Sequence, residues 1–208
     1  MPDIPQRSSR PLRADAEQSI ARILIAAEQV FAADPSATLE AVASAAGVAR
    51  ATVHRRFSSR DDLRDALVNA INTKLRDAIA SANTDTAPPL VALYQLTVAT
   101  LDLKVDWRAS WQLIDLDATD QRGIDPSNIS HLDALLQRSQ DAGLFRPGID
   151  IPWARSVYMA LIHEASTIRS ENESASHWAN RIMQTLLSGI GNNEHNLEAL
   201  LAQPPTSD

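Results

Sequence analysis

The sequence predicts an all-α protein, and three observations support that prediction. Apolar residues recur at the three-to-four-residue spacing of amphipathic helices along most of the chain. No stretch within residues 1–80 alternates apolar and polar side chains for long enough to form a strand. With 44% hydrophobic and 22% charged residues among its 208, the chain has a globular composition that excludes wholesale disorder.

The chain is expected to begin with an arm and a helix. Residues 1–14 hold three prolines and three arginines with few apolar side chains, which favours a mobile basic arm. The apolar stripe over 20–31 then indicates a helix. That helix is expected to end at Asp34, because the residue before a proline avoids the α region.

Three more helices are expected before residue 82. Thr38 offers an N-cap hydroxyl to a short helix that Gly47 interrupts. A second short helix over 49–56 and a long helix over 59–80 follow. Beyond a polar, proline-containing break over 82–89, which we take as a soft boundary, the helical periods continue. Further helices are expected to begin near Leu90, Trp107, Asp125, Asp150 and Ser174.

Charge divides the chain unevenly. The net charge is −7, yet residues 1–60 hold eight arginines against six acidic residues. The remaining residues hold 11 basic and 20 acidic side chains. Such a division suggests two parts with different partners.

The most informative stretch is TLEAVASAAGVARATVHRRF, residues 38–57. It predicts two short helices joined by a tight turn at Gly47, where glycine relieves the steric cost of a positive φ. A helix fits the major groove of B-DNA, and its polar edge needs cations for phosphates and donors for base edges. The stretch is therefore typical of a DNA-binding helix-turn-helix. Its second helix offers polar groups at Arg50, Thr52, His54, Arg55 and Arg56.

This stretch and its flanks resemble the DNA-binding domain of the TetR family of transcriptional regulators. The resemblance extends over residues 20–67, about a quarter of the chain. The number and spacing of the matches make it specific. The matching positions are Ala27, Phe31, Thr38-Leu39, Val42-Ala43, Ala46-Gly47-Val48, Ala51-Thr52-Val53, Phe57, Ser59-Arg60-Asp61 and Leu63.

The resemblance implies roles for seven residues, with three departures from the family pattern. Arg50 and Arg55 become candidates for contact with base edges. The phosphate-contact candidates are Thr38, Thr52, His54, Arg56 and Arg60. Ala49 stands where the family has a serine or threonine N-cap, which costs about 1 kcal/mol of helix stability. His54 replaces the usual tyrosine, and Arg56 replaces the usual histidine or tyrosine, so hydrogen-bond donors are kept.

The resemblance also implies the layout of the remaining chain. The family binds a small effector among its middle helices and dimerises through its last two long helices, here over about 150–169 and 174–190. Trp107 and Trp111 share one helix face and, with Arg108, are candidates to line the effector pocket; packing of the two rings in the core is the alternative. The effector candidates are Tyr94, Trp107, Arg108, Trp111 and His131. The expected organisation is a basic arm over 1–14, a helix-turn-helix domain over 15–62, a helical effector-binding and dimerisation domain over 63–200 entered by a connecting helix over 63–80, and a frayed tail over 201–208.

The leading hypothesis is a sequence-specific DNA-binding regulator: a repressor that holds a near-palindromic operator as a homodimer until a small-molecule effector releases it. The alternatives are an all-helical interaction module that has lost DNA binding, and a helical enzyme. The chain has no G-x-S-x-G, no H-E-x-x-H and too few glycines for a phosphate-cradling loop, which disfavours an enzyme. No cysteine is present, which excludes disulfides and thiolate metal sites. We expect no cofactor, no metal and no membrane segment, and a cytoplasmic location.

Overall fold

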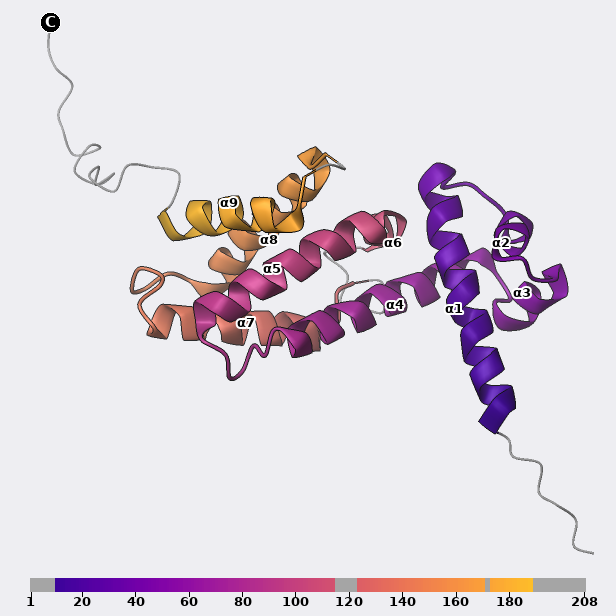
Figure 1. The fold of residues 1–208 in the computed structure, drawn as a ribbon, viewed down its shortest axis with the longest axis horizontal. Helices are drawn as coiled ribbons and strands as arrows, with labels where there is room; N and C mark the ends of the chain where they lie inside the picture. The colour runs from indigo at the N-terminus through magenta and orange to yellow at the C-terminus, as the bar shows by residue number, and fades with distance from the viewer. Residues whose placement is uncertain (1–9, 115–122, 171–172, 189–208) are drawn as a thin grey trace, which may run out of the picture. The chain divides into compact units, whose positions relative to one another are not determined.

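The computed structural model describes residues 10–114, 123–170 and 173–188, and within these ranges the chain is all-α (Figure 1). The predicted fold class is confirmed. No helix in this described part is both long and apolar enough to span a bilayer. The helices are α1 (Arg10–Ala33), α2 (Leu39–Ala46), α3 (Arg50–Arg56), α4 (Arg60–Ser81), α5 (Pro89–Asp106), α6 (Arg108–Leu113), α7 (Pro126–Asp141), α8 (Ile151–Ile168) and α9 (Ala175–Ser188).

Most helix ends lie where local signals place them. Helix α1 ends at Ala33, before the Asp34-Pro35 pair. The Asp150 carboxylate accepts a hydrogen bond from the backbone N–H of Trp153 at 2.8 Å and so caps α8. Gly143, after α7, has a left-handed φ of 75°. Each of these signals acts between residues a few positions apart in the chain, so the sequence alone predicts where these helix ends lie.

The start of α1 differs from its apolar period. The helix begins at Arg10, so residues 10–14 of the expected arm are helical, while residues 1–9 lie outside the described residues. Apolar spacing marks only the part of a helix that is buried. The alanine, glutamate and glutamine residues over 14–18 have high helix propensity and extend α1 beyond that part.

The described residues form two compact units. The first takes its residues from 1–74 and 106–125, and the second from 75–105 and 126–208. Helix α6 therefore belongs to the first unit, although its sequence position suggested the second helical domain. The core of the first unit consists of Ile23, Ala26, Ala27, Phe31, Leu39, Val42, Ala43, Val53, Phe57, Leu63, Leu67 and Ala109, with smaller contributions from their neighbours.

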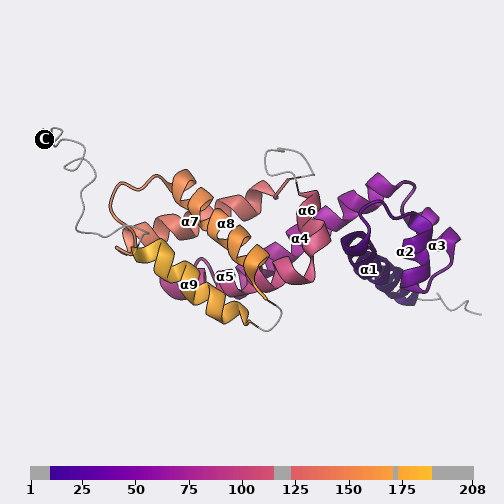
Figure 2. The same ribbon diagram turned by 90° about the horizontal axis from the view of Figure 1, so that it is seen from above.

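The second unit is built from the end of α4 together with α5, α7, α8 and α9. Helix α8 packs against both α7 and α9, and Figure 2 shows it crossing between them. Tyr158 lies at the centre of this unit with 1% of its surface exposed. Its hydroxyl lies 2.9 Å from the Thr97 hydroxyl, which also bonds the Leu93 carbonyl at 2.7 Å. A buried polar pair thus joins α5 to α8 inside an otherwise apolar core.

Candidate nucleic-acid interface

Helices α2 and α3 are held at a defined turn. Thr38 accepts a hydrogen bond from the backbone N–H of Ala41 at 3.3 Å and caps α2 as predicted. Gly47 ends α2 with a left-handed φ of 62°. A Cβ at this position would lie 3.3 Å from Arg22 Nη2, which donates to the Ala46 carbonyl at 2.8 Å. The turn therefore requires glycine for its backbone, and Arg22 of α1 fixes it from outside.

Helix α3 buries one edge and exposes the other. Val53 is fully buried, and Phe57 at the C-cap is 6% exposed, so these two residues anchor the helix to the first unit. The opposite edge carries cations and no acid: Arg50, His54, Arg55 and Arg56 are exposed, and Thr52 is half-buried. Such an edge offers donors to both phosphates and base edges.

Ala49 is the N-cap of α3, with extended backbone angles and no side-chain hydrogen bond. We expect Ala49→Ser to raise the free energy of unfolding by about 1 kcal/mol, because a serine hydroxyl accepts from a first-turn N–H. Urea unfolding measures the change. Ala49→Val is the control, since valine supplies no acceptor and, like alanine, is a poor N-cap residue. Equal stability of the serine and alanine proteins would contradict this account.

A single carboxylate lies against two of the predicted DNA contacts. Glu40, in the first turn of α2, has its Oε1 2.6 Å from Arg50 Nη2 and 3.3 Å from His54 Nε2. Arg50 Nε lies 3.4 Å from the same His54 nitrogen. The pKa of Glu40 is below its usual value, chiefly because the carboxylate accepts from its own backbone N–H and then from His54 and Thr38. From its place in the sequence, Glu40 is only an acid in the first turn of a helix, where the helix dipole favours it.

The remaining arginines of the candidate interface differ in whether they already contact other side chains. Arg55 and Arg56 are exposed and make no ion pair or hydrogen bond with any described residue. Arg60 is half-buried, with its guanidinium carbon 5.3 Å from the centroid of the Phe31 ring. Its Nε is buried without a hydrogen-bond partner among the described residues. Arg55 and Arg56 are therefore the cations best placed to meet DNA without first leaving another group.

Glu28 is an important residue of this unit that sequence analysis missed. It is 6% exposed on α1, and its two oxygens accept hydrogen bonds from the backbone N–H groups of Ala109 and Ser110 at 2.5 and 2.9 Å. The Ser110 hydroxyl adds a third bond at 2.5 Å. Glu28 thus caps α6 and holds it against α1. The available signal was an acid beside Ala27, Leu24 and Phe31 on the apolar face of α1.

The protein family of this helix-turn-helix follows from its similarity to known proteins. Residues 23–67 match the family model described as bacterial regulatory proteins, tetR family. The chain is 31% identical over 178 residues to the HTH-type transcriptional repressor LfrR of Mycolicibacterium smegmatis, covering 84% of this chain and 91% of LfrR.

The chain belongs to the TetR family. It is also 31% identical over 162 residues to the HTH-type transcriptional regulator NfxB of Pseudomonas aeruginosa, covering 76% of this chain and 87% of NfxB. The crystal structure of LfrR in complex with proflavine has the same fold, with a TM-score of 0.63 and 29% identity, covering 84% of this chain and 98% of LfrR. This TetR-family chain is accordingly a DNA-binding transcriptional regulator.

The effector candidates of this TetR-family regulator fall in different units. Tyr94 is half-buried against the core of the second unit, whereas His131 is exposed with Nδ1 2.7 Å from the Ser127 carbonyl. Trp107 is half-buried against the core of the first unit, with Lys74 Nζ 4.8 Å from its ring centroid. Arg108 is exposed and Trp111 half-buried in the same unit. Within the first unit the candidates are thus Trp107, Arg108 and Trp111, and within the second they are Tyr94 and His131.

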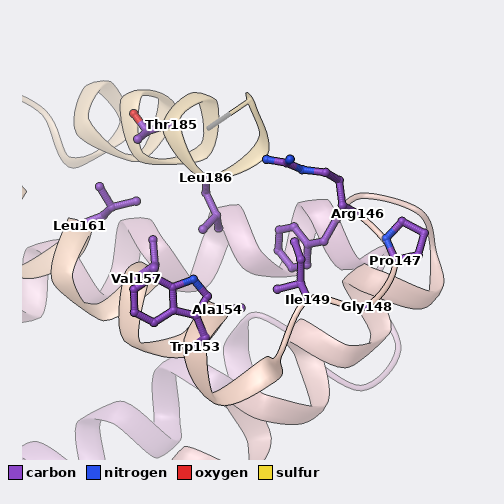
Figure 3. Close-up of a pocket in the computed structure, with 11 residues that line it drawn as sticks. Arg146, Pro147, Gly148, Ile149, Trp153, Ala154, Val157, Leu161, Thr185 and Leu186 are labelled. Atoms are coloured by element: carbon purple, nitrogen blue, oxygen red, sulfur yellow. The ribbon is translucent and has the colours of Figure 1, made fainter. Parts of the chain in front are cut away.

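An apolar groove of about 570 Å³ lies on the second unit, between the start of α8 and the end of α9. Figure 3 shows Leu186 of α9 pointing toward Val157 and Trp153 of α8, with Arg146 extending along the rim. Trp153 is 66% exposed, unusual for so large an apolar side chain. The groove thus presents a large hydrophobic surface on the two helices expected to dimerise.

Proposed function

We propose that this TetR-family regulator is a repressor that binds a near-palindromic operator as a homodimer, leaves it when a small molecule binds, and catalyses no reaction. The observation that carries the proposal is the exposed edge of α3, a helix with no acid of its own, with Arg55 and Arg56 unpaired among the described residues. The repressor LfrR, a relative over most of the chain, supports the sign of regulation. We place the protein in the cytoplasm with its DNA.

The roles we propose follow the geometry of the site. Arg55 and Arg50 contact base edges in the major groove. Backbone phosphates are bound by Thr38, Thr52, His54, Arg56 and Arg60, with Arg60 fixed over Phe31 before binding. A two-fold operator requires a two-fold protein, and we propose that a second copy packs on the groove of α8 and α9, covering Trp153.

We further propose that the effector is a planar aromatic cation. The support is that LfrR was crystallised with proflavine, together with the acidic balance of the chain outside residues 1–60. Tyr94, which packs half-buried against the second core, is the candidate best placed to stack on such a ring within that unit. Proflavine is the probe: it should release a labelled operator, whereas an anionic dye of similar size should not.

The experiment that tests the function is selection of DNA from a random library at about 150 mM salt, where weak phosphate binding is suppressed. Enrichment of a near-palindrome with half-sites about one helical turn apart would support a dimeric, sequence-specific regulator. No enrichment by folded protein, with and without proflavine, would contradict the proposal and favour an interaction module.

We expect Arg55→Ala to weaken binding to the selected operator by about tenfold and to relax preference at one base position, because a guanidinium fork discriminates bases. Arg56→Ala should instead weaken binding to all sequences alike and reduce the salt dependence. Fluorescence anisotropy with operator and unrelated duplexes separates the two effects. Arg64→Ala, which removes an arginine of α4 that pairs with Asp61 at 4.0 Å, is the matched control. A uniform loss for Arg55→Ala would assign that residue to phosphate instead.

A further inference from the structure

Glu40 joins the two helices of the helix-turn-helix through their polar side chains. It lies on α2, while both of its partners, Arg50 and His54, lie one turn apart on α3. The carboxylate is 41% exposed and its Arg50 partner 69% exposed, so the cluster lies on the surface. An acid on a surface that must approach DNA phosphates raises the cost of binding, since like charges repel. We therefore expect Glu40 to contribute to DNA recognition in a way that offsets this electrostatic cost.

The contacts leave Arg50 able to recognise a base. Arg50 directs Nε toward His54 and Nη2 toward Glu40, so the side of the guanidinium is engaged. Nη1 takes part in none of these contacts, and Nη2 keeps a second hydrogen. The end of the guanidinium can thus donate two parallel hydrogen bonds to guanine O6 and N7 while Glu40 holds its side.

The same carboxylate constrains His54. His54 Nε2 either carries a hydrogen, which it donates to Glu40, or a lone pair, which accepts from Arg50 Nε. It cannot do both, so Glu40 and Arg50 compete for one nitrogen. When Nε2–H donates its hydrogen bond to Glu40, the imidazole is turned with Nδ1 away from the carboxylate. Nδ1 can then donate to a phosphate when it also carries a hydrogen, as it does in the doubly protonated ring.

We propose that Glu40 is a positioning residue for DNA recognition, which orders Arg50 and His54 on α3 before the operator binds. Ordering a long arginine side chain in advance reduces the entropy that binding would otherwise cost, and it fixes the direction from which the guanidinium meets the base. The inference rests on the proposed function and deepens it: Glu40 contributes to sequence preference while opposing overall affinity for DNA.

The test uses the full chain with Glu40→Ala and Glu40→Gln. Library selection gives base preferences, and anisotropy gives affinity for the operator and for an unrelated duplex at equal salt. In Glu40→Ala we expect affinity for unrelated DNA to rise and the ratio of specific to unrelated affinity to fall about tenfold, with preference relaxed at one position in each half-site. Glu40→Gln keeps an acceptor for Arg50 and should retain most of that preference, although it loses the same charge.

Asp61→Asn is the matched control, because Asp61 is an exposed acid of α4 whose ion-pair partner is Arg64 at 4.0 Å. It should raise both affinities by the same small factor. If Glu40→Ala behaves like Asp61→Asn, with base preferences unchanged, Glu40 is only a surface charge and the inference fails while the proposed function stands. If the unaltered protein selects no sequence, the proposed function and the inference fail together.

Discussion

Replacing Glu28 with alanine is expected to lower the free energy of unfolding by about 3 kcal/mol, because it leaves buried donors without acceptors. The carboxylate accepts from two backbone N–H groups and one hydroxyl, and Ala109 and Ser110 are 3% and 0% exposed. Urea unfolding followed by circular dichroism measures the loss.

The companion variants separate hydrogen bonding from packing. Glu28→Gln keeps one oxygen but turns an amide N–H₂ toward another donor, so we expect it to lose roughly half as much stability. Glu17→Ala removes an exposed acid from the same helix and should change stability by less than about 0.5 kcal/mol. A loss under about 1 kcal/mol for Glu28→Ala would mean that the cap is not a stabilising contact.

The second large effect is expected in the other unit, where Tyr158→Ala should destabilise by about 4 kcal/mol. Among the described residues, Tyr158 is the largest side chain with under 2% of its surface exposed, so truncation opens a cavity and removes the hydroxyl bonded to Thr97. Burial also raises the pKa of Tyr158, so the neutral hydroxyl persists over the pH range in which the fold is studied. Thermal and urea unfolding both report the change.

Two conservative variants divide this loss into its parts. Tyr158→Phe keeps the ring and removes the hydroxyl, and should cost about 1 kcal/mol. Combining it with Thr97→Val removes both partners of the hydrogen bond, and the double variant should be less destabilised than the sum of the two single variants. Strict additivity would show that the two hydroxyls contribute independently. A loss in Tyr158→Phe as large as that in Tyr158→Ala would show that the cavity matters little.

Local signals predicted much of the fold, because they act over a few residues. Thr38, Gly47 and Asp150 are at the helix ends where their side chains or backbone angles place them. The limits of α1 were less predictable, since a polar stretch with good helix propensity has no apolar period to mark it. The assignment of α6 to the first unit was not predictable from its own six residues, because Glu28, far away in sequence, caps it.

The same distinction applies to the candidate interface. Periodicity and the family pattern predicted that Arg50, His54 and Arg55 lie on the exposed edge of one helix, as they do, because that edge depends only on the helix itself. The pairing of two of them with Glu40 depends on how α2 and α3 cross, which no single-helix pattern contains. The stacking of Arg60 on Phe31 likewise joins two helices and was missed.

The contact between Glu28 and α6 limits how a DNA-binding unit can be exchanged between two regulators. The N-terminal unit is discontinuous in sequence, so exchanging DNA-binding specificity between two regulators by one crossover after α3 or within α4 would join α1 of one parent to α6 of the other. A chimera made by a crossover within α4, beyond Arg60, keeps every predicted DNA contact yet mismatches a buried carboxylate with foreign backbone. Transplanting residues 108–113 together with α1, α2 and α3 would keep the Glu28 carboxylate with its own donors. A graftable recognition unit in this fold is therefore better defined by that pairing than by the end of the sequence motif.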